Sequence, residues 1–313
     1  MSKLVEIKEK LKNFYAENEN FLKPVWKFIL IFISLLLIRN NINYMPTINS
    51  LPVILAVSIL LAFAPWGFNM IIIAGFICAN VFSASLELGI MMLLTVFIMM
   101  LMFFRFTPEQ AAFLIIIPLA FFLNIPYIIP IAAGLLFTPL SVVSVAFGTV
   151  IYFMLRTISA SVVNDVNMSK SSANVIINNI GADKQLVIML VAFTITLVIV
   201  YLIRRMSADY SWTIAIIVGS IVEFLTIMVG NTALLSKAQL PSLIVGSLVS
   251  MVLAFILQFF VFSVDYQRTE HTQFEDDEYY YYVKAVPKVN VSAPQLNVKK
   301  INAQRKRKRK TYQ

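Results

Sequence analysis

The chain has 313 residues, of which 59% are hydrophobic and 13% are charged, and its formal net charge is +9. Soluble globular domains are nearer half apolar and about a quarter charged. The single cysteine, Cys78, excludes an internal disulfide, and the single histidine, His271, excludes a zinc site of the Cys/His type.

Charge is concentrated at the two ends of the chain. Residues 1–27 and 264–313 carry 17 of the 25 lysines and arginines, whereas the residues between them carry eight cations and six acids. A water-soluble fold of that size needs a charged surface, so we expect lipid to be the solvent of this middle part. The sequence therefore predicts an all-α integral membrane protein, with a transmembrane domain at 25–263 between a cytoplasmic amphipathic segment (1–24) and a cytoplasmic tail.

The N-terminal segment is charged, but Leu4, Ile7, Leu11 and Phe14 recur in it at helical spacing. This pattern predicts an amphipathic helix on the membrane surface, and a solvated helix that leads into the first span is the alternative. The apolar stretch 25–38 follows. Because no small-residue cleavage site comes after it, we interpret it as an uncleaved first span and not as a signal peptide.

The next apolar stretches are too long to be single spans, since a bilayer core needs about 20 helical residues. Residues 51–104 are interrupted at Pro65-Trp66-Gly67 and around Ser83–Glu87, and residues 111–155 are interrupted by prolines, which end or kink helices. We therefore predict short helices at 51–64, 67–83, 86–104, 111–123, 125–138 and 140–156. Three cleaner spans are predicted at 186–203, 211–230 and 242–263.

The distribution of lysine and arginine predicts the orientation. The two cation-rich ends are placed in the cytoplasm, and Arg105 and the Arg204-Arg205 pair fall on the same side. The loops 157–185 and 231–241 then lie outside. Two cytoplasmic ends require an even number of spans, which is ten, or eight if two proline-bounded segments form a re-entrant hairpin.

The two interrupted stretches resemble each other. Leu61-Ala62-Phe63 matches Leu119-Ala120-Phe121 at an offset of 58, and Gly89 matches Gly148 at an offset of 59. Two units of three segments would be inverted repeats, which in transporters place the substrate site at the repeat interface. Chance matching of residues that are common in membrane helices is the alternative.

Four residues are candidates for a substrate or ion pathway. Glu223 falls near the middle of a predicted span, where it could relay a proton or bind a cation, or be a protonated structural residue bonded to a neighbouring helix. Glu87 lies at a predicted turn, where it could join the pathway or simply meet water. Pro126 and Pro130 frame a broken helix whose freed carbonyls could coordinate a cation, although helix packing explains them equally well.

The tail carries an acidic run, 275–278, followed by four tyrosines and alternating valines that favour an extended strand. We interpret this segment as a strand that binds the sheet edge of a partner protein, because no strand partner is evident elsewhere in the chain. A strand that lies on the protein's own cytoplasmic face is the alternative. The predicted partner-binding residues are Tyr279, Tyr280, Tyr281, Tyr282 and Lys284.

A block of like charges follows near the end of the sequence and is expected to stay solvated. Anionic lipid attracts such cations by about 1 kcal/mol each near the surface. No base-reading element accompanies the block, so we expect no nucleic acid partner. The predicted lipid-binding residues are Arg305, Lys306, Arg307, Lys308, Arg309 and Lys310.

Motifs of common enzymes are absent from the sequence. It contains no Walker loop, no H-E-x-x-H and no serine-elbow motif. We therefore expect no enzyme activity, no catalytic residue, no metal and no cofactor.

A distinctive run, EDDEYYYYVKAVPK, begins at Glu275. Through this run, the Arg204-Arg205 pair, residues 210–219 and Phe259–Phe262, the chain resembles a family of polytopic membrane proteins from clostridia-like Gram-positive bacteria, some of which are labelled ABC transporter permeases. The resemblance extends over most of the chain. It implies a bacterial plasma membrane, and it supplies no substrate and no catalytic residue.

Two functional hypotheses follow from the sequence. The first is a transport-associated, permease-like subunit with Glu223 and the broken helices near its solute pathway. The second is a scaffold of the cell envelope that recruits cytoplasmic or membrane proteins through its tail.

Overall fold

The computed structural model describes residues 2–164, 183–207, 210–233, 240–261, 270–275 and 280–285. The chain divides into two units, one of residues 14–262 and one of the two ends, 1–13 with 263–313.

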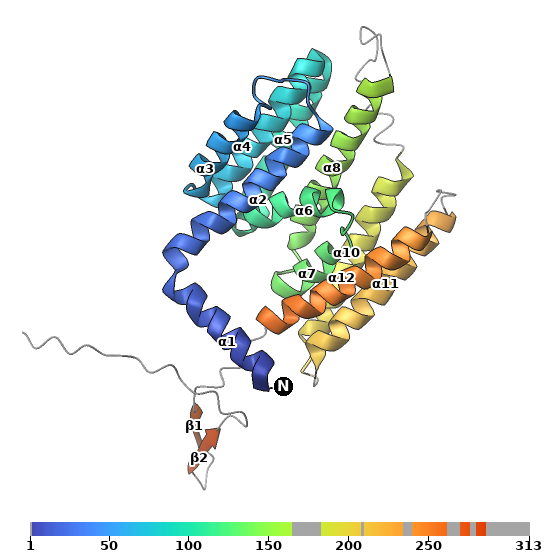
Figure 1. Cartoon of the computed structure of the whole chain (residues 1–313). Coiled ribbons are helices and arrows are strands. Elements are labelled where there is room, and N and C mark those ends of the chain that lie inside the picture. The colour runs from blue at the N-terminus through green and yellow to red at the C-terminus, as the bar shows by residue number, and fades with distance from the viewer. Residues whose placement is uncertain are drawn as a thin grey trace, which may run out of the picture. The chain divides into compact units, whose positions relative to one another are not determined.

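The predicted apolar segments are helices, with ends that differ from the expected ones by a few residues (Figure 1). The first six are α2 (Glu19–Asn41), α3 (Leu51–Ala62), α4 (Trp66–Ala84), α5 (Leu86–Phe106), α6 (Ala111–Phe122) and α7 (Ile128–Leu136). A short 3-10 helix, η1 (Pro108–Gln110), precedes α6, and the later helices are α8 (Ser141–Asn164), α10 (Lys184–Arg204), α11 (Ser211–Ala233) and α12 (Leu240–Val261).

Seven helices in the described part of the chain are long and apolar enough to cross a bilayer: α2, α4, α5, α8, α10, α11 and α12. The chain is therefore a multi-span membrane protein, and the predicted all-α membrane class is confirmed. Helices α3 and α6 have 12 residues each and α7 has nine. At 1.5 Å per residue they reach about 18 Å or less, which is short of the roughly 30 Å hydrocarbon core. The count of eight to ten spans stays a prediction.

Proline and serine explain where the first helices end. Pro65 is the extended N-cap of α4, because a proline at this point has no amide to donate and disfavours a continuous helix. Ser85 is extended as well, and it caps both the end of α4 and the start of α5. The breaks predicted at these two positions are confirmed.

The break between α6 and α7 is an ordered turn. The amide of Ile125 donates to the carbonyl of Ala120 at 2.9 Å, and the amide of Asn124 donates to the carbonyl of Phe121 at 3.1 Å. Asn124 has φ 59, the left-handed conformation that this type of C-cap requires and that asparagine tolerates. The chain then turns into α7 with Pro126 at the corner.

The helices of residues 14–262 pack in two groups joined by α6 and α8 (Figure 1). In the first group α2 packs on α3, and α4 packs on α5. In the second, α10 and α12 both pack on α11 and on α7. Helix α6 contacts α2 and α4 on one side and α7 on the other, and α8 contacts both α5 and α10.

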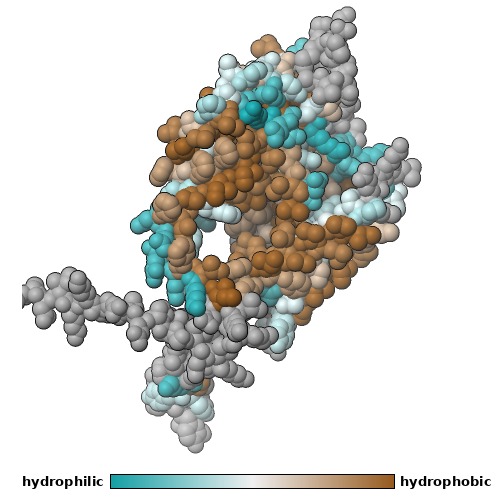
Figure 2. Space-filling model, viewed as in Figure 1, coloured by the Kyte–Doolittle hydropathy of each residue, from teal (hydrophilic) through white to brown (hydrophobic). Residues whose placement is uncertain are grey.

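The outer surface of these helices is suited to lipid. Apolar side chains cover much of the face seen in Figure 2, and hydrophilic ones gather toward the helix ends. Leu60, Phe97 and Leu248 are exposed at 73%, 57% and 58%. Exposed patches of this extent are rare on soluble monomers, whereas in a bilayer they meet acyl chains.

Two buried asparagines attach the loop after α2 to α4. The Nδ2 atom of Asn49 donates to Oδ1 of Asn80 at 2.6 Å, and Nδ2 of Asn80 donates to Oδ1 of Asn49 at 3.1 Å. Neither side chain is more than 1% exposed. The pair satisfies itself in the interior, where an unpaired amide would be costly.

The possible repeat receives no support from its matched glycines. A Cβ atom on Gly89 would meet Phe82 of the preceding helix, whereas one on Gly148 would meet Ile117 of α6. The middle helices of the two units also differ, since α4 has 19 residues and α7 has nine. The repeat stays a prediction.

The unit formed by the chain ends contains a helix segment and a hairpin. Helix α1 (Ser2–Glu17) forms as predicted, and Ile7, Leu11 and Phe14 of its apolar stripe are about half exposed. In the tail, β1 (Glu270–Glu275) pairs antiparallel with β2 (Tyr280–Ala285). The expectation that the tyrosine segment has no strand partner in this chain is therefore wrong. The polar sequence of β1 has low strand propensity and gives no signal of a strand, and pairing makes it one.

Candidate functional site

Glu223 lies at the centre of α11 and is 1% exposed. Its Oε1 atom has no hydrogen-bond partner among the described residues. The sequence placed this residue near the middle of a span, and the structure places its side chain in the interior; the bond to a neighbouring helix, which was the structural alternative, is not seen for Oε1. A carboxyl group in such surroundings is rare in membrane helices and marks a candidate functional position.

Close packing between α10 and α11 places a second buried oxygen, that of Thr196, at the same level along the helix axes as Glu223. A Cβ atom on Gly219 would lie 2.4 Å from Val200, and one on Gly230 would lie 2.9 Å from Ile188, so the two helices run antiparallel. Moving one turn along each helix from the first contact brings Thr196 level with Glu223. Thr196 is fully buried, and its Oγ1 atom also has no partner within the described part.

Helix α12 contributes a third buried oxygen. The side-chain amide of Gln258 donates to Oγ1 of Thr213 at 3.1 Å, which sets the antiparallel register of α12 against α11. Glu223 follows Thr213 by about ten residues on α11, and Ser250 precedes Gln258 by about eight on α12. Along the helix axes, Ser250 therefore lies within one turn of Glu223. Ser250 is fully buried, and its Oγ atom has no described partner. We call Thr196, Glu223 and Ser250 the polar layer.

A cavity of about 340 Å³ lies beside the break between α6 and α7. Residues of the end of α6, of the break itself, of α8, of the start of α10 and of the first half of α12 form its wall. They are Phe121, Asn124, Ile125, Pro126, Tyr127, Tyr152, Phe153, Arg156, Gln185, Met189, Ser242, Val245, Gly246 and Val249.

Arg156 is the one charged residue among the described residues that line this cavity. Its Nη1 atom donates to Oε1 of Gln185 at 3.0 Å, and its guanidinium lies 5.9 Å from the ring centroid of Phe153. Next to it Phe121 and Tyr152 stack with their centroids 4.4 Å apart. The wall thus combines one cation with a cluster of aromatic side chains.

Tyr127 connects the cavity to the polar layer. It lines the cavity and packs against buried Ile188 and Ile227, and Ile227 lies one helical turn from Glu223 on α11. A Cβ atom on Gly246 would lie 2.5 Å from its ring, so the glycine makes room for the tyrosine against α12.

The structure brings some of the predicted pathway residues together and separates others. Pro126 lines the cavity, and Pro130 is buried in the first turn of α7, where a proline removes no helical hydrogen bond. Glu87 is exposed in the first turn of α5, which packs on α4 and α8 and not on α11. The fold therefore separates Glu87 from the other three candidates, since α7, which follows Pro126 and contains Pro130, packs on α11.

The carbonyls near the prolines have partners within the chain. The carbonyl of Pro126 accepts from the amide of Ile129 at 3.0 Å. At the other end of α7, Nη1 of Arg204 donates to the carbonyls of Leu135 and, at 3.4 Å, Gly134. These atoms are therefore occupied, and among the described residues no cluster of three or more acidic, histidine or cysteine side chains could hold a metal ion.

Sequence reasoning did not single out Arg156, Thr196 or Ser250. Arg156 falls at the end of a predicted segment and resembles an ordinary interfacial arginine. Hydroxyl residues are common in membrane helices, so Thr196 and Ser250 carry no signal until the packing of three helices is known. An arginine that follows an aromatic pair, Tyr152-Phe153, in an otherwise uncharged stretch is the signal that could have drawn notice to the cavity.

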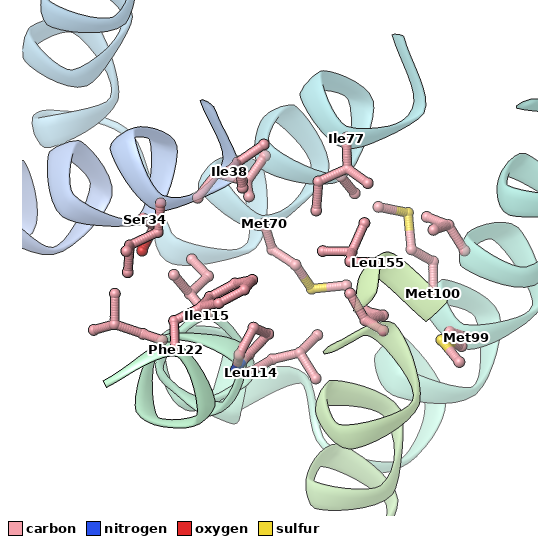
Figure 3. A pocket seen from close by; sticks show the side chains of 17 residues that line it. Ser34, Ile38, Met70, Ile77, Met99, Met100, Leu114, Ile115, Phe122 and Leu155 are labelled. Carbon is pink, nitrogen blue, oxygen red and sulfur yellow. The ribbon is translucent and has the colours of Figure 1, made fainter. Parts of the chain in front are cut away.

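A second cavity, of about 70 Å³, lies among α2, α4, α5, α6 and α8 (Figure 3). Methionines such as Met70, Met99 and Met100 point toward it. Its hydroxyl residue, Ser34, donates to the carbonyl of Leu30 at 2.7 Å and is thereby satisfied. None of its lining residues is charged, so it offers packing space and no titratable chemistry.

The predicted binding residues of the tail are described only in part. The side chains of Tyr281, Tyr282, Val283 and Lys284 are exposed on β2. Tyr280 pairs in the strand opposite Glu275. Tyr279 and the basic run 305–310 lie outside the described residues.

No protein-family model, curated protein or solved structure matches the chain. The resemblance to the permease-labelled clostridial family stays a prediction.

Proposed function

We propose that the chain is a permease-like transport subunit, whose solute pathway runs through the cavity beside the α6–α7 break and past the polar layer. The observation that carries this proposal is Tyr127, which lines the cavity and packs against Ile227, one helical turn from the buried Glu223. Interrupted short helices next to an intramembrane acid are the usual surroundings of substrate and ion sites in transporters.

Each part has a role in this proposal. The cavity between α8, α10 and α12 receives the solute. Glu223 exchanges a proton or binds a cation, which couples solute movement to an ion. The α6–α7 break acts as a hinge. Two short helices joined by a turn can change their relative orientation with less loss of hydrogen bonds than a continuous helix can.

The orientation follows from charge. With both termini in the cytoplasm of a bacterial plasma membrane and eight to ten spans, the 157–185 loop lies outside. Arg156 and Gln185 flank that loop in sequence, so the cavity would open toward the outside and the solute would be imported. Anionic lipid bound to the basic run 305–310 would hold the tail at the inner surface.

The test is uptake by living cells, measured for all solutes of the medium at once so that no substrate has to be chosen. A deletion strain is complemented with the wild-type chain, with Glu223→Gln or with Glu109→Gln, and loss of solutes from the medium is measured by untargeted mass spectrometry. Glu109 is exposed in η1 and is the matched control. We expect at least one solute whose uptake is restored by the wild type and by the control, and falls about tenfold or more with Glu223→Gln.

Identical depletion profiles in the deletion strain and in all complemented strains would exclude transport as the function. A solute restored equally by Glu223→Gln and Glu109→Gln would remove Glu223 from the pathway while keeping transport.

A second candidate function is an envelope scaffold, and the exposed side chains of β2 favour it. A two-stranded hairpin leaves an open edge on each strand, to which a partner's strand can add. Replacing Tyr279–Tyr282 with serines should release a protein that otherwise co-purifies after crosslinking in the native membrane. An unchanged set of co-purifying proteins, identified by mass spectrometry, would contradict recruitment through the tyrosines.

A further inference from the structure

The wall of the 340 Å³ cavity has the chemistry of an anion site. Arg156 is its one charged residue among the described lining residues, and no acidic side chain lies among them to neutralise it. An arginine has five N–H donors, and the described bond to Gln185 uses a donor of one nitrogen, so others can meet a second acceptor. The bond to Gln185 and the ring of Phe153, 5.9 Å away, limit where the guanidinium can lie.

The rest of the wall selects the body of the ligand. Phe121 and Tyr152 are stacked at an interplanar angle of 15°, and Phe153 meets Tyr152 edge-on at 87°. Val245 and Val249 of α12 also line the cavity. Flat apolar groups pack favourably against aromatic side chains, both by area burial and by the preferred ring geometries. A fully hydrated ion such as inorganic phosphate would pair with Arg156 but would make no favourable contact with the aromatic and valine side chains of the wall.

The volume limits the size of the ligand. Small-molecule sites usually occupy about 300–1,000 Å³, so a cavity of 340 Å³ suits a molecule of one or two rings and is too small for a phospholipid with two acyl chains.

We propose that this cavity binds a small organic carboxylate with a flat apolar body. The carboxylate pairs with Arg156 and the body lies against Phe121 and Tyr152. The inference rests on the proposed function only for the assignment of this cavity as the solute site. An interfacial arginine that merely reaches for water or lipid headgroups is the competing explanation.

The test is equilibrium binding of 2-naphthoate to the purified full-length chain in phosphatidylcholine nanodiscs, with empty nanodiscs subtracted. We expect saturable binding that Arg156→Gln weakens about tenfold to a hundredfold, since a hydrogen bond to a charged group is worth about 1.5–3 kcal/mol. Arg105→Gln, at the exposed end of α5 and away from the cavity, should bind like the wild type. 2-Naphthylmethanol, which has the same rings without the charge, should bind the wild type about tenfold or more weakly than the acid.

The outcomes that overturn the proposal are equally direct. Equal affinity of Arg156→Gln and Arg105→Gln, equal affinity for acid and alcohol, or no saturable binding would each refute it. If Arg156→Gln does not fold, the comparison of acid with alcohol on the wild type decides. Loss of naphthoate binding when the nanodiscs contain about 30% phosphatidylglycerol would assign the site to a lipid headgroup and overturn the solute assignment.

The binding experiment and the uptake experiment can fail independently, so they distinguish this inference from the proposed function. Saturable naphthoate binding by a chain that restores no solute uptake would uphold this inference and refute the proposed function. Uptake that depends on Glu223 without naphthoate binding would do the reverse.

Discussion

Buried amides and carboxyls impose the strongest constraints at the scale of single residues. Asn49 and Asn80 satisfy each other and attach the loop after α2 to α4, whereas Oε1 of Glu223 has no described partner. Groups of the first kind stabilise a fold. Those of the second kind weaken it and persist where function needs them.

The asparagine pair gives a prediction for stability. Asn49→Ala should lower the free energy of unfolding by about 1–3 kcal/mol, because it leaves Oδ1 of Asn80 buried without its donor, although Nδ2 of Asn80 still donates to the carbonyl of Phe76. The double variant Asn49→Ala/Asn80→Ala should lose less than the sum of the single variants, since it leaves no orphaned amide. Thermal unfolding in nanodiscs measures this. The same loss from Asn41→Ala, at an exposed position, would contradict the account.

Glu223 could be found from the sequence because a lone carboxylate in an apolar run is conspicuous. Its surroundings could not be. Thr196 and Ser250 lie at the level of Glu223 only because of how α10 and α12 pack on α11. The contact at Gly219 fixes the position of α10, and the bond from Gln258 fixes that of α12. The same holds for Arg156, whose partner Gln185 lies across the loop 165–182, which is outside the described residues.

At the scale of elements, close helix contacts depend on glycines. A Cβ atom on Gly219 would lie 2.4 Å from Cγ2 of Val200, and a valine in a helix has little freedom to turn away. Gly219→Ala should therefore cost about 1–3 kcal/mol of stability by overpacking. Gly75→Ala is the matched control, because a Cβ atom there meets nothing within 4 Å and alanine favours a helix by up to about 1 kcal/mol.

Both glycine variants can be compared by thermal unfolding under the same conditions. The account expects the melting temperature to fall for Gly219→Ala and to hold or rise for Gly75→Ala. A reversed order would mean that the contact between α10 and α11 is looser than described.

Turn chemistry made most helix ends predictable. Pro65 and Ser85 mark breaks in the sequence, and the helices end there. The short α7 was less predictable, because its end depends on Arg204, which donates to the carbonyls of Leu135 and Gly134 from another helix. From the sequence alone, Arg204 indicates only a cytoplasmic charge. In the structure it also caps the C-terminal end of α7 by donating to its carbonyls.

At the scale of the whole molecule, composition predicted the membrane class but not the number of spans. Seven helices of the described ranges are long enough to cross, whereas α3, α6 and α7 are too short to do so alone. Their role depends on packing depth, which no residue pattern encodes. The tail hairpin could not be predicted for a similar reason, because β1 is a strand only through its pairing with β2.

The central claim is that function resides in the membrane helices around Glu223 and not in the tail. One uptake measurement tests it, with the deletion strain complemented either by Glu223→Gln or by a chain truncated after Val264. The account predicts that the truncated chain restores at least part of the solute uptake and that uptake with Glu223→Gln falls about tenfold or more. Restored uptake with Glu223→Gln and none with the truncated chain would contradict it, and would move the function to the tail.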